Sequence, residues 1–584
     1  MATDELGIDD GWWDNTGEWN EANPDTVATI RDILGRSRDR AEAAPPRWFV
    51  RHGSAPSLES PGVVVLEEGA EIVVDVALPH DLPIGYHRLH PADRGPTTEL
   101  IVSPLSLDGL GTRRWGVTAQ LYSCRSTRSW GLGDFGDLAR IGRWLASRGG
   151  SVIGINPLFD VLPAAPRQAS PYSPSTRRHL DPIYSDIGPA PDHFEPSELL
   201  DRDATWAAKI AWLTDEYAAS EQAQPDEPGS YAMFCTLAEH FGTGWREWPV
   251  ELHDPDGDAV RGFAARHRER VAFWQYVQDR TDGQLQDVRS ALASEGITLM
   301  GDLPVGVDSG GFDAWTYADS LARDMFVGAP PDPFSPHGQN WGLPPFDPWA
   351  LRSIGFAPFV ETIRGTLGRF GGLRIDHVMG LFRLFWIPEG AEPVDGAYVR
   401  YPADEMLDLL VLEATRAGAF VVGEDLGTVE AGVRETLTAR GVAGTKVALF
   451  EDEPNNWPGH SLGTLTTHDL PTVEGAVSGS DAAGDPKIAD RLLALTGRGP
   501  EAAPEDVLVA AHERLARSGS DLVLATMEDL VGSRLRVNLP GTIDSYPNWR
   551  IALPVAIDEL DEHPVAERIT GLLAAERPRI NWGS

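Results

Sequence analysis

Three acidic residues stand where apolar runs of the chain end: Asp376 in "LRIDH", Glu424 in "VVGEDLG" and Asp469 in "TTHDLPT". Two of them have a histidine beside them, His377 after Asp376 and His468 before Asp469. Cleaving a glycosidic bond needs two carboxyl groups, because one attacks or stabilises the anomeric carbon while the other protonates the leaving oxygen. A single acid of this kind is more often a salt bridge or a loop cap. Three together favour catalysis.

Arg374 precedes Asp376 by two residues in "GGLRIDHVMG". Residues two apart on a strand point to the same face of the sheet. A positive charge close to a carboxyl group favours its ionised form. We therefore expect Arg374 to keep Asp376 ionised, and a purely structural salt bridge is the alternative for Arg374.

The three acids are far apart in the chain, so a barrel would have to bring them together. From Trp115 onward, short apolar runs recur, and each is followed by polar or glycine residues and a helix-like stretch. The runs cover residues 116–124, 151–159, 297–307, 372–378, 419–427, 444–450, 462–470 and 522–530. Strands that alternate with helices in this way predict an α/β fold, a (β/α)8 TIM barrel, whose chemistry lies at the C-terminal ends of its strands.

The regions outside these runs suggest the domain organisation. Residues 1–112 contain an amphipathic helical segment and β-branched runs at hairpin spacing, which predict a small β-rich N-terminal domain. Residues 113–584 would form the catalytic barrel. The stretch 162–296, between the second and third strands, is too long for one crossover helix and reads as helical. We expect it to be an inserted, mostly helical subdomain.

Composition excludes several classes of function. The 584 residues carry a net charge of −39, and the only lysines are Lys209, Lys446 and Lys487. Nucleic acids and anionic lipid surfaces need clustered cations, so neither is an expected partner. No apolar run is long enough to span a membrane. A neutral substrate fits this composition better.

Other features concern the compartment and cofactors. The N-terminal residues are acidic and lack the apolar core of a secretory signal. The two cysteines, Cys124 and Cys235, are best explained as reduced thiols, so we expect a cytoplasmic protein. The histidines show no metal-ligand spacing, and the acids are better explained as catalytic. No metal and no cofactor are therefore expected.

Beyond these residue-level arguments, the chain resembles the amylomaltases, a family of 4-α-glucanotransferases related to the α-amylase clan. The resemblance follows family order over about residues 115–554. It rests on "SWGLGDFGDL", "SPYSPSTRRHLDPIYSDI", "GDLPVGVDSGGFDAW", "PPDPFSPHGQNWGLPPFDP", "LRIDHVMGLFR", "GEDLG", "THDLPT" and "NLPGTIDSYPNWR". Any one motif could arise by chance, but the ordered set is very specific.

This resemblance implies an enzyme of the hexosyltransferase type. It would transfer α-1,4-glucan segments from a glucan or maltooligosaccharide donor to a glucose or maltooligosaccharide acceptor, by a retaining double displacement. Asp376 would be the nucleophile that forms a covalent glucosyl-enzyme. Glu424 would be the acid/base, which needs a raised pKa. Asp469 would stabilise the transition state through sugar hydroxyls.

Further residues are expected to bind substrate. They are Arg374, His377, His468, Asp308, Tyr172, Trp341 and Asn340. The last two lie in a Gly/Pro-rich stretch, 335–348, that we interpret as a loop covering the cleft, the alternative being a rigid connector. Tyr172 could instead be a core residue, and Asp308 could instead cap a turn.

Two alternative functions remain open from the sequence. A retaining α-1,4-glucan hydrolase shares the covalent intermediate, and water rather than a sugar would then be the acceptor. A non-catalytic glucan-binding protein on a degraded barrel is the alternative from another class. Retention of all three acids argues against the second. The oligomeric state is open.

Overall fold

The computed structural model describes residues 2–14, 17–111, 113–163, 167–191, 198–220, 229–332, 335–451, 453–481, 486–542 and 545–579. Two compact units form. Unit 1 comprises residues 1–109, 317–368 and 377–442, and unit 2 comprises residues 110–316, 369–376 and 443–584. The predicted domain boundary falls on Thr112, which lies outside the described residues.

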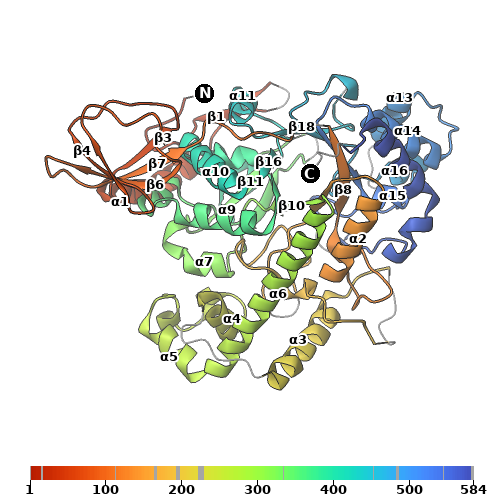
Figure 1. The fold of residues 1–584 in the computed structure, drawn as a ribbon, viewed down its shortest axis with the longest axis horizontal. Helices are drawn as coiled ribbons and strands as arrows, with labels where there is room; N and C mark the ends of the chain where they lie inside the picture. The colour runs from red at the N-terminus through yellow and green to blue at the C-terminus, as the bar shows by residue number, and fades with distance from the viewer. Residues whose placement is uncertain are drawn as a thin grey trace. The chain divides into compact units, whose positions relative to one another are not determined.

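The largest sheet in the described part of the chain has eight strands, several of which are labelled in Figure 1. Its strands are β8 (Arg114–Ala119), β9 (Val152–Ile155), β10 (Thr298–Leu303), β13 (Gly372–Ile375), β16 (Phe420–Gly423), β17 (Gly444–Val447), β18 (Ser461–Thr464) and β19 (Leu522–Thr526). They follow the order β16-β13-β10-β9-β8-β19-β18-β17, and the pairs within unit 2 are parallel. All eight predicted strands are present, so the (β/α)8 barrel is confirmed.

Helices separate and follow these strands. They are α2 (Phe135–Ser147), α6 (Arg268–Ser294), α7 (Phe312–Thr316), α9 (Ala357–Arg369), α10 (Ala403–Ala417), α11 (Val433–Ala439), α12 (Val473–Ser478), α13 (Pro486–Thr496), α14 (Pro504–Ala516), α15 (Met527–Leu530) and α16 (Pro564–Glu576). Because helices cover parallel strands, those strands are buried on both faces and read as continuous apolar runs. All five residues of β19, "LVLAT", are buried.

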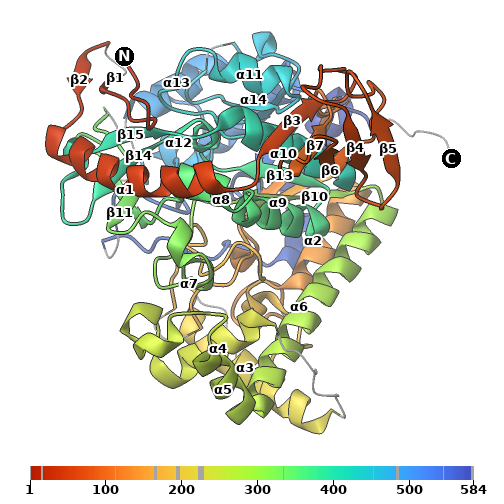
Figure 2. The same cartoon turned by 90° about the vertical axis from the view of Figure 1, so that its left-hand side faces the viewer.

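The described part of 162–296 is largely helical. It contains α3 (Arg202–Ala219), α4 (Ser230–Phe241), α5 (Asp258–Arg266) and α6. Helix α6 packs beside α2 and against β10, so it also serves the barrel as the helix that leads into the third strand (Figures 1 and 2). Residues 164–166, 192–197 and 221–228 of this stretch lie outside the described residues.

The described residues of unit 1 form three smaller sheets. The first pairs β1 (Gly11–Trp13) with β2 (Trp19–Glu21), and helix α1 (Pro24–Ala43) follows. A five-stranded sheet has the order β3-β7-β6-β4-β5, with strands Arg47–Arg51, Thr98–Ser103, Gly85–Pro91, Gly62–Val65 and Glu71–Val74. Its own apolar core includes Val50, Val64, Leu89 and Leu100. A short helix, α8 (Pro348–Ser353), packs against α1.

The third sheet corrects part of the interpretation of residues 335–348 as a loop. Its order is β12-β11-β14-β15, with strands Gln339–Leu343, Met325–Ala329, Arg383–Pro388 and Ala397–Arg400. Five residues of the predicted loop therefore form a strand. The Gly/Pro-rich text is typical of a loop, but β11 offers an antiparallel edge with which this segment pairs. No helix in the described part of the chain is both long and apolar enough to cross a membrane.

Close packing of the first two barrel strands generates a stability prediction. A Cβ at Gly116 would lie 1.9 Å from the carbonyl oxygen of Val152, so β8 and β9 approach as they do only because residue 116 is glycine. We expect Gly116→Ala to destabilise the fold by about 1–3 kcal/mol, since backbone must shift. The measurement is thermal unfolding by calorimetry.

Gly35→Ala is the matched control, because Gly35 lies within α1 and a Cβ there meets nothing within 4 Å. It should stabilise the protein by up to about 1 kcal/mol through helix propensity. Equal melting temperatures for Gly116→Ala and the wild type would contradict the packing argument.

Candidate active site

One arginine pairs with two carboxylates where β10 and β13 end. Arg374 in β13 lies opposite Asp302 in β10 in the parallel register. Its Nη1 donates to both carboxylate oxygens of Asp302, at 2.7 and 2.9 Å, and lies 3.0 Å from Oδ1 of Asp376. The ion pair between Arg374 and Asp376 that the sequence predicts is therefore present, but Arg374 shares its charge with a second acid.

Burial has the largest effect on the pKa of Asp376 and raises it. The Arg374 guanidinium lowers this pKa and the Asp302 carboxylate raises it, so the pKa of Asp376 stays above its ordinary value. The side chain of Asp376 is 22% exposed, which leaves its oxygens accessible to a ligand. Arg374 therefore favours the ionised form of Asp376, as expected, but its effect on the pKa of Asp376 is smaller than the opposing effects of burial and Asp302 together.

Glu424 directly follows β16, and backbone N–H groups fix its carboxyl group. Oε2 accepts a hydrogen bond from the N–H of His377 at 2.9 Å, and Oε1 accepts one from the N–H of Leu426 at 2.8 Å. The carbonyl oxygen of Glu424 accepts from the N–H of Val378 at 3.0 Å. His377 is the residue after Asp376 in the chain, so the segment that follows one candidate acid orients the other.

His468 and Asp469, in the segment after β18, form a second group of polar contacts with Asn538, which lies in the segment after α15. The Nε2 atom of His468 lies 3.4 Å from Oδ2 of Asp469, and the Asn538 side-chain amide donates to Oδ1 at 2.7 Å. Burial favours the neutral form of each ionisable group, but the opposite charges outweigh it. The pKa of Asp469 is therefore lowered and that of His468 is raised.

Tyr172 connects these two groups. Its hydroxyl donates to Oδ2 of Asp302 at 2.7 Å and lies 3.2 Å from Nδ1 of His468. Its ring stacks on His468 with centroids 4.7 Å apart, and the ring of Trp549 is 5.3 Å away. Tyr172 is thus a half-buried member of the polar network, rather than a tyrosine of the apolar core.

Backbone strain is found at His377, which follows Asp376 in the chain, and at Trp549, whose ring lies 5.3 Å from those of Tyr172 and His468. His377 has a φ of 48° and Trp549 has a φ of 61°. Both lie in the left-handed region, which residues other than glycine rarely adopt. Such a conformation costs on the order of 1–3 kcal/mol and persists where the surroundings impose it, most often at functional sites. His377 is also buried enough that its pKa is lowered to about 4.

Three predicted binding residues remain: Trp341, Asn340 and Asp308. Of these, Trp341 contacts His377, whereas Asn340 and Asp308 accept hydrogen bonds from nearby backbone N–H groups. Trp341 in β12 meets the ring of His377 edge-on, with centroids 5.3 Å apart. Asn340 is exposed and accepts a hydrogen bond from the N–H of Gly342 at 2.9 Å. Asp308 accepts from the N–H of Gly310 at 2.7 Å, which is the turn-capping contact that the sequence left as its alternative.

A buried ion cluster holds the loop that contains Tyr172. The guanidinium of Arg167 is 2.7 Å from Oδ2 of Asp181 and 3.3 Å from Oδ1 of Asp160, and all three side chains are almost fully buried. The same guanidinium lies 3.8 Å from the ring centroid of Trp206 in α3. Asp160 and Asp181, which lie before and after Tyr172 in the chain, therefore bind the same guanidinium group, and Trp206 of α3 packs over that group.

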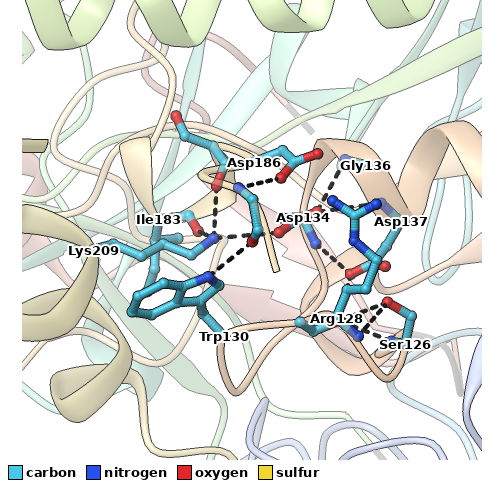
Figure 3. A network of polar contacts seen from close by, with 12 residues as sticks. Ser126, Arg128, Trp130, Asp134, Gly136, Asp137, Ile183, Asp186 and Lys209 are labelled. Carbon is cyan, nitrogen blue, oxygen red and sulfur yellow. Dashed lines mark hydrogen bonds and ion pairs between the residues drawn. The ribbon is translucent and has the colours of Figure 1, made fainter. Parts of the chain in front are cut away.

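A second buried cation, Lys209 of α3, ties the helical stretch to the beginning of α2 (Figure 3). Its Nζ donates to the carbonyl oxygens of Ile183 and Ser185, each at 2.7 Å, and is 3.7 Å from Oδ2 of Asp134. Asp134 caps α2 by accepting from the N–H of Gly136 at 2.9 Å. Burial raises the pKa of Asp134 to about 7, although Lys209 opposes the shift.

Comparison with known proteins identifies the family. A profile of the 4-α-glucanotransferase family matches residues 119–556. A 4-alpha-glucanotransferase of Mycobacterium tuberculosis is 37% identical over 556 residues, covering 82% of this chain and 77% of that protein. One from Haemophilus influenzae is 32% identical over 530 residues, covering 76% of each. The chain belongs to the 4-α-glucanotransferase family.

Solved structures agree with this assignment. An amylomaltase from Corynebacterium glutamicum superimposes with a TM-score of 0.83 at 28% identity, covering 97% of this chain and 98% of that one. An amylomaltase from Streptococcus agalactiae in complex with acarbose, at 19% identity, shares the fold with a TM-score of 0.66, covering 80% of this chain and 99% of that one. The resemblance to the amylomaltases is confirmed, and with it the assignment to a family of transferases.

Three residues of the candidate site in this 4-α-glucanotransferase family member were not singled out from the sequence: Asp302, Asn538 and Trp549. Each lies in a segment that carries the family resemblance, "GDLPVGVDSGGFDAW" for Asp302 and "NLPGTIDSYPNWR" for the other two. Ile543 and Asp544 of the second segment lie outside the described residues. An acid inside the apolar run of β10 was the available signal for Asp302. Within the described residues, no group of three or more His, Cys, Asp or Glu could hold a metal ion.

The pairing of His468 with Asp469 generates a prediction on titration. Asp469→Asn should lower the pKa of His468, because the carboxylate that outweighs burial is removed. The measurement is an NMR titration of ring protons in histidine-labelled protein. The pKa of His377, which burial alone lowers, is the internal control and should not move.

The same substitution has a signed effect on stability. The raised pKa of His468 contributes stability that is present below about pH 6.5 and lost as pH rises through the folded-state pKa. The lowered pKa of Asp469 contributes stability that is present above about pH 3.9 and lost as pH falls through its folded-state pKa. The free energy of unfolding of the wild type should therefore exceed that of Asp469→Asn by the largest amount between about pH 3.9 and pH 6.5. A stability difference that is largest at alkaline pH would contradict the pairing.

Proposed function

We propose that this protein transfers segments of α-1,4-glucan between maltooligosaccharides by a retaining double displacement. The observation that carries the proposal is the sharing of Arg374 between Asp302 and Asp376 at the ends of two barrel strands. A nucleophilic carboxylate must be ionised, accessible and held still. Arg374 supplies the charge and the orientation, while partial exposure of Asp376 leaves room for an anomeric carbon.

In the first step, an oxygen of Asp376 attacks the anomeric carbon and the bond to the leaving sugar breaks. Glu424 gives its proton to the departing oxygen, and the two backbone N–H groups of His377 and Leu426 hold its carboxyl group in position. In the second step, Glu424 takes a proton from the acceptor hydroxyl, which attacks the glucosyl ester and releases Asp376. The anomeric configuration is retained because it is inverted twice.

Asp469, His468 and Tyr172 would bind the sugar ring. The lowered pKa of Asp469 keeps it ionised, so it accepts hydrogen bonds from sugar hydroxyls, and Asn538 orients it. Trp341 and Asn340 in β12 would contact the glucan chain, and Asp308 would reach a donor hydroxyl. Glucose or a maltooligosaccharide is the acceptor, and the proton transfers need no metal or cofactor.

The first test distinguishes transfer from hydrolysis. With maltotriose as the sole substrate and a chelator present, we expect glucose and chains longer than maltotriose, separated by chromatography. Transfer moves a segment from one chain to another, so the total number of reducing ends stays constant, whereas hydrolysis adds one per cleavage. A steady rise in reducing ends with no chain longer than the substrate would make the protein a hydrolase.

The second test separates the roles of the two acids with α-glucosyl fluoride, a donor whose leaving group needs no protonation. Glu424→Gln should still form the glucosyl ester with this donor, but its breakdown should slow by roughly 10²–10⁴-fold because the base is missing. Mass spectrometry should then find one added glucosyl group on the peptide containing Asp376. Asp376→Asn should lose activity with every donor.

Asp254→Asn is a comparison variant, because Asp254 is exposed, accepts a turn hydrogen bond from the N–H of Asp256 at 3.1 Å and is assigned no role in binding or proton transfer. It should retain glucosyl transfer from the fluoride. An adduct on Glu424 in the Asp376→Asn protein would reverse the two roles. Full activity in both acid variants would refute the site.

A further inference from the structure

Two distant stretches of the chain lie side by side next to the candidate site. Residues 198–200 run antiparallel to residues 550–552, which follow 350 residues later in the chain. Backbone hydrogen bonds of 2.7 and 3.0 Å join the two stretches. The first stretch leads into α3, which begins at Arg202, and the second directly follows Trp549. This pairing brings the first residue of α3 close to Trp549.

Arg202 contacts the backbone of Trp549. Its Nη2 donates to the carbonyl oxygen of Trp549 at 3.0 Å. Its guanidinium carbon lies 4.5 Å from the ring centroid of Tyr122, a fully buried residue, and this cation–π contact helps to fix the guanidinium group. Asp201 caps α3 by accepting a hydrogen bond from the N–H of Ala204 at 2.9 Å. The helix end that presents Arg202 is therefore itself fixed.

Trp549 needs such support because its backbone is strained. Its φ of 61° is unfavourable for a residue with a Cβ and persists only where surrounding contacts impose it. On one side of the strained residue, the N–H of Trp549 donates to the carbonyl oxygen of Val537 at 3.1 Å. On the other side, its carbonyl oxygen accepts the hydrogen bond from Arg202. The two bonds hold the peptide groups that flank the strained residue.

The position of Trp549 affects His468 in two ways. The ring centroid of Trp549 is 5.3 Å from that of His468 and 5.3 Å from that of Tyr172, which stacks on His468. Trp549 is also bonded to Val537, and the next residue, Asn538, donates from its N–H to the carbonyl oxygen of His468 at 3.0 Å. Movement of Trp549 would therefore displace His468 both through the ring contact and through the backbone.

We propose that Arg202 is a positioning residue for glucosyl transfer, because it holds the strained Trp549 and Trp549 in turn holds His468 and Tyr172. The proposal rests on the proposed function, which assigns sugar binding to His468, Tyr172 and Asp469. Arg202 acts through Trp549 and is assigned no contact with the substrate. A small displacement of groups that orient a reacting sugar lowers the rate more than the affinity, because their contacts matter most in the transition state.

The kinetic test removes the hydrogen bond from Arg202. Arg202→Met lacks the donor but keeps an unbranched, flexible side chain that can pack on the Tyr122 ring. We expect kcat for maltotriose to fall by about 10–100-fold, with KM unchanged within about threefold. Arg202→Lys keeps a donor with a different reach and should give a kcat between those of the wild type and Arg202→Met. It also carries the test if Arg202→Met does not fold.

A spectroscopic measurement follows the positioning directly. The aromatic rings of Tyr172 and Trp549 lie close enough to His468 for their ring currents to act on its ring protons. Arg202→Met should therefore shift the NMR signals of these protons in histidine-labelled protein, and Arg202→Lys should shift them less. The ring signals of His512, which is buried in α14, should not move.

Arg550→Ala is the matched control variant. The Nε atom of Arg550 donates across the same two stretches, to the carbonyl oxygen of Leu200 at 3.5 Å rather than to Trp549. This variant should keep the wild-type kcat and the wild-type signals of His468. Thermal unfolding checks that each variant folds.

The proposal requires both effects in Arg202→Met. A shifted His468 signal with unchanged kcat would overturn it, and so would a lower kcat with an unshifted signal. Equal losses in Arg202→Met and Arg550→Ala would also overturn it, because they would indicate general loosening of the two stretches. Equal values for Arg202→Met and Arg202→Lys would do the same, because the donor would then have no effect.

Failure of the proposed function gives a different result from failure of this inference. If wild-type protein does not disproportionate maltotriose, the proposed function is wrong, and the His468 signals alone decide whether Arg202 positions that residue. If the wild type is active and Arg202→Met matches it in kcat and in the His468 signals, only the role of Arg202 is wrong.

Discussion

The sharing of one guanidinium between two carboxylates governs the candidate site. Asp302 and Asp376 stand at the ends of neighbouring strands, and both would carry negative charge in a partly buried place where repulsion is strong. Arg374 compensates both, and its position is fixed because it faces Asp302 in the sheet register. Removing it would leave two uncompensated buried charges, which is far more costly than losing a surface ion pair. Each proposed step at Asp376 depends on this pairing.

From that pairing, hydrogen bonds extend through Tyr172 to the segment after β18. Tyr172 joins Asp302 to His468, His468 pairs with Asp469, and Asn538 holds the far side of Asp469. Polar networks of this kind polarise and rigidify one another, so the position of one member affects the rest. The buried Arg167 cluster holds the loop of Tyr172 and lies under α3, which links the helical stretch 162–296 to the geometry of the site.

Much of the fold could be predicted because the barrel strands are short, buried on both faces and therefore continuously apolar. β19, "LVLAT", shows the pattern directly. β12 was not predicted from the sequence. Its glycine- and proline-rich surroundings favour a loop, and it is a strand because it pairs with β11. The double role of α6, which belongs to the long stretch before β10 and also packs on α2, is likewise set by tertiary contacts rather than by local periodicity.

The sequence by itself determined the number and order of the barrel strands and the acidic residues that follow three of them. Apolar runs and the residues that end them are local features of the sequence. Its ordered motifs also indicated the 4-α-glucanotransferase family. Only the tertiary structure decided which groups pair. Asp302 meets Arg374 across 72 residues of chain, and Asn538 meets Asp469 across 69, because strand register and loop packing place them together. The direction of each pKa shift follows from those contacts and from burial. Both depend on the folded structure and cannot be read from the position of a residue in the sequence.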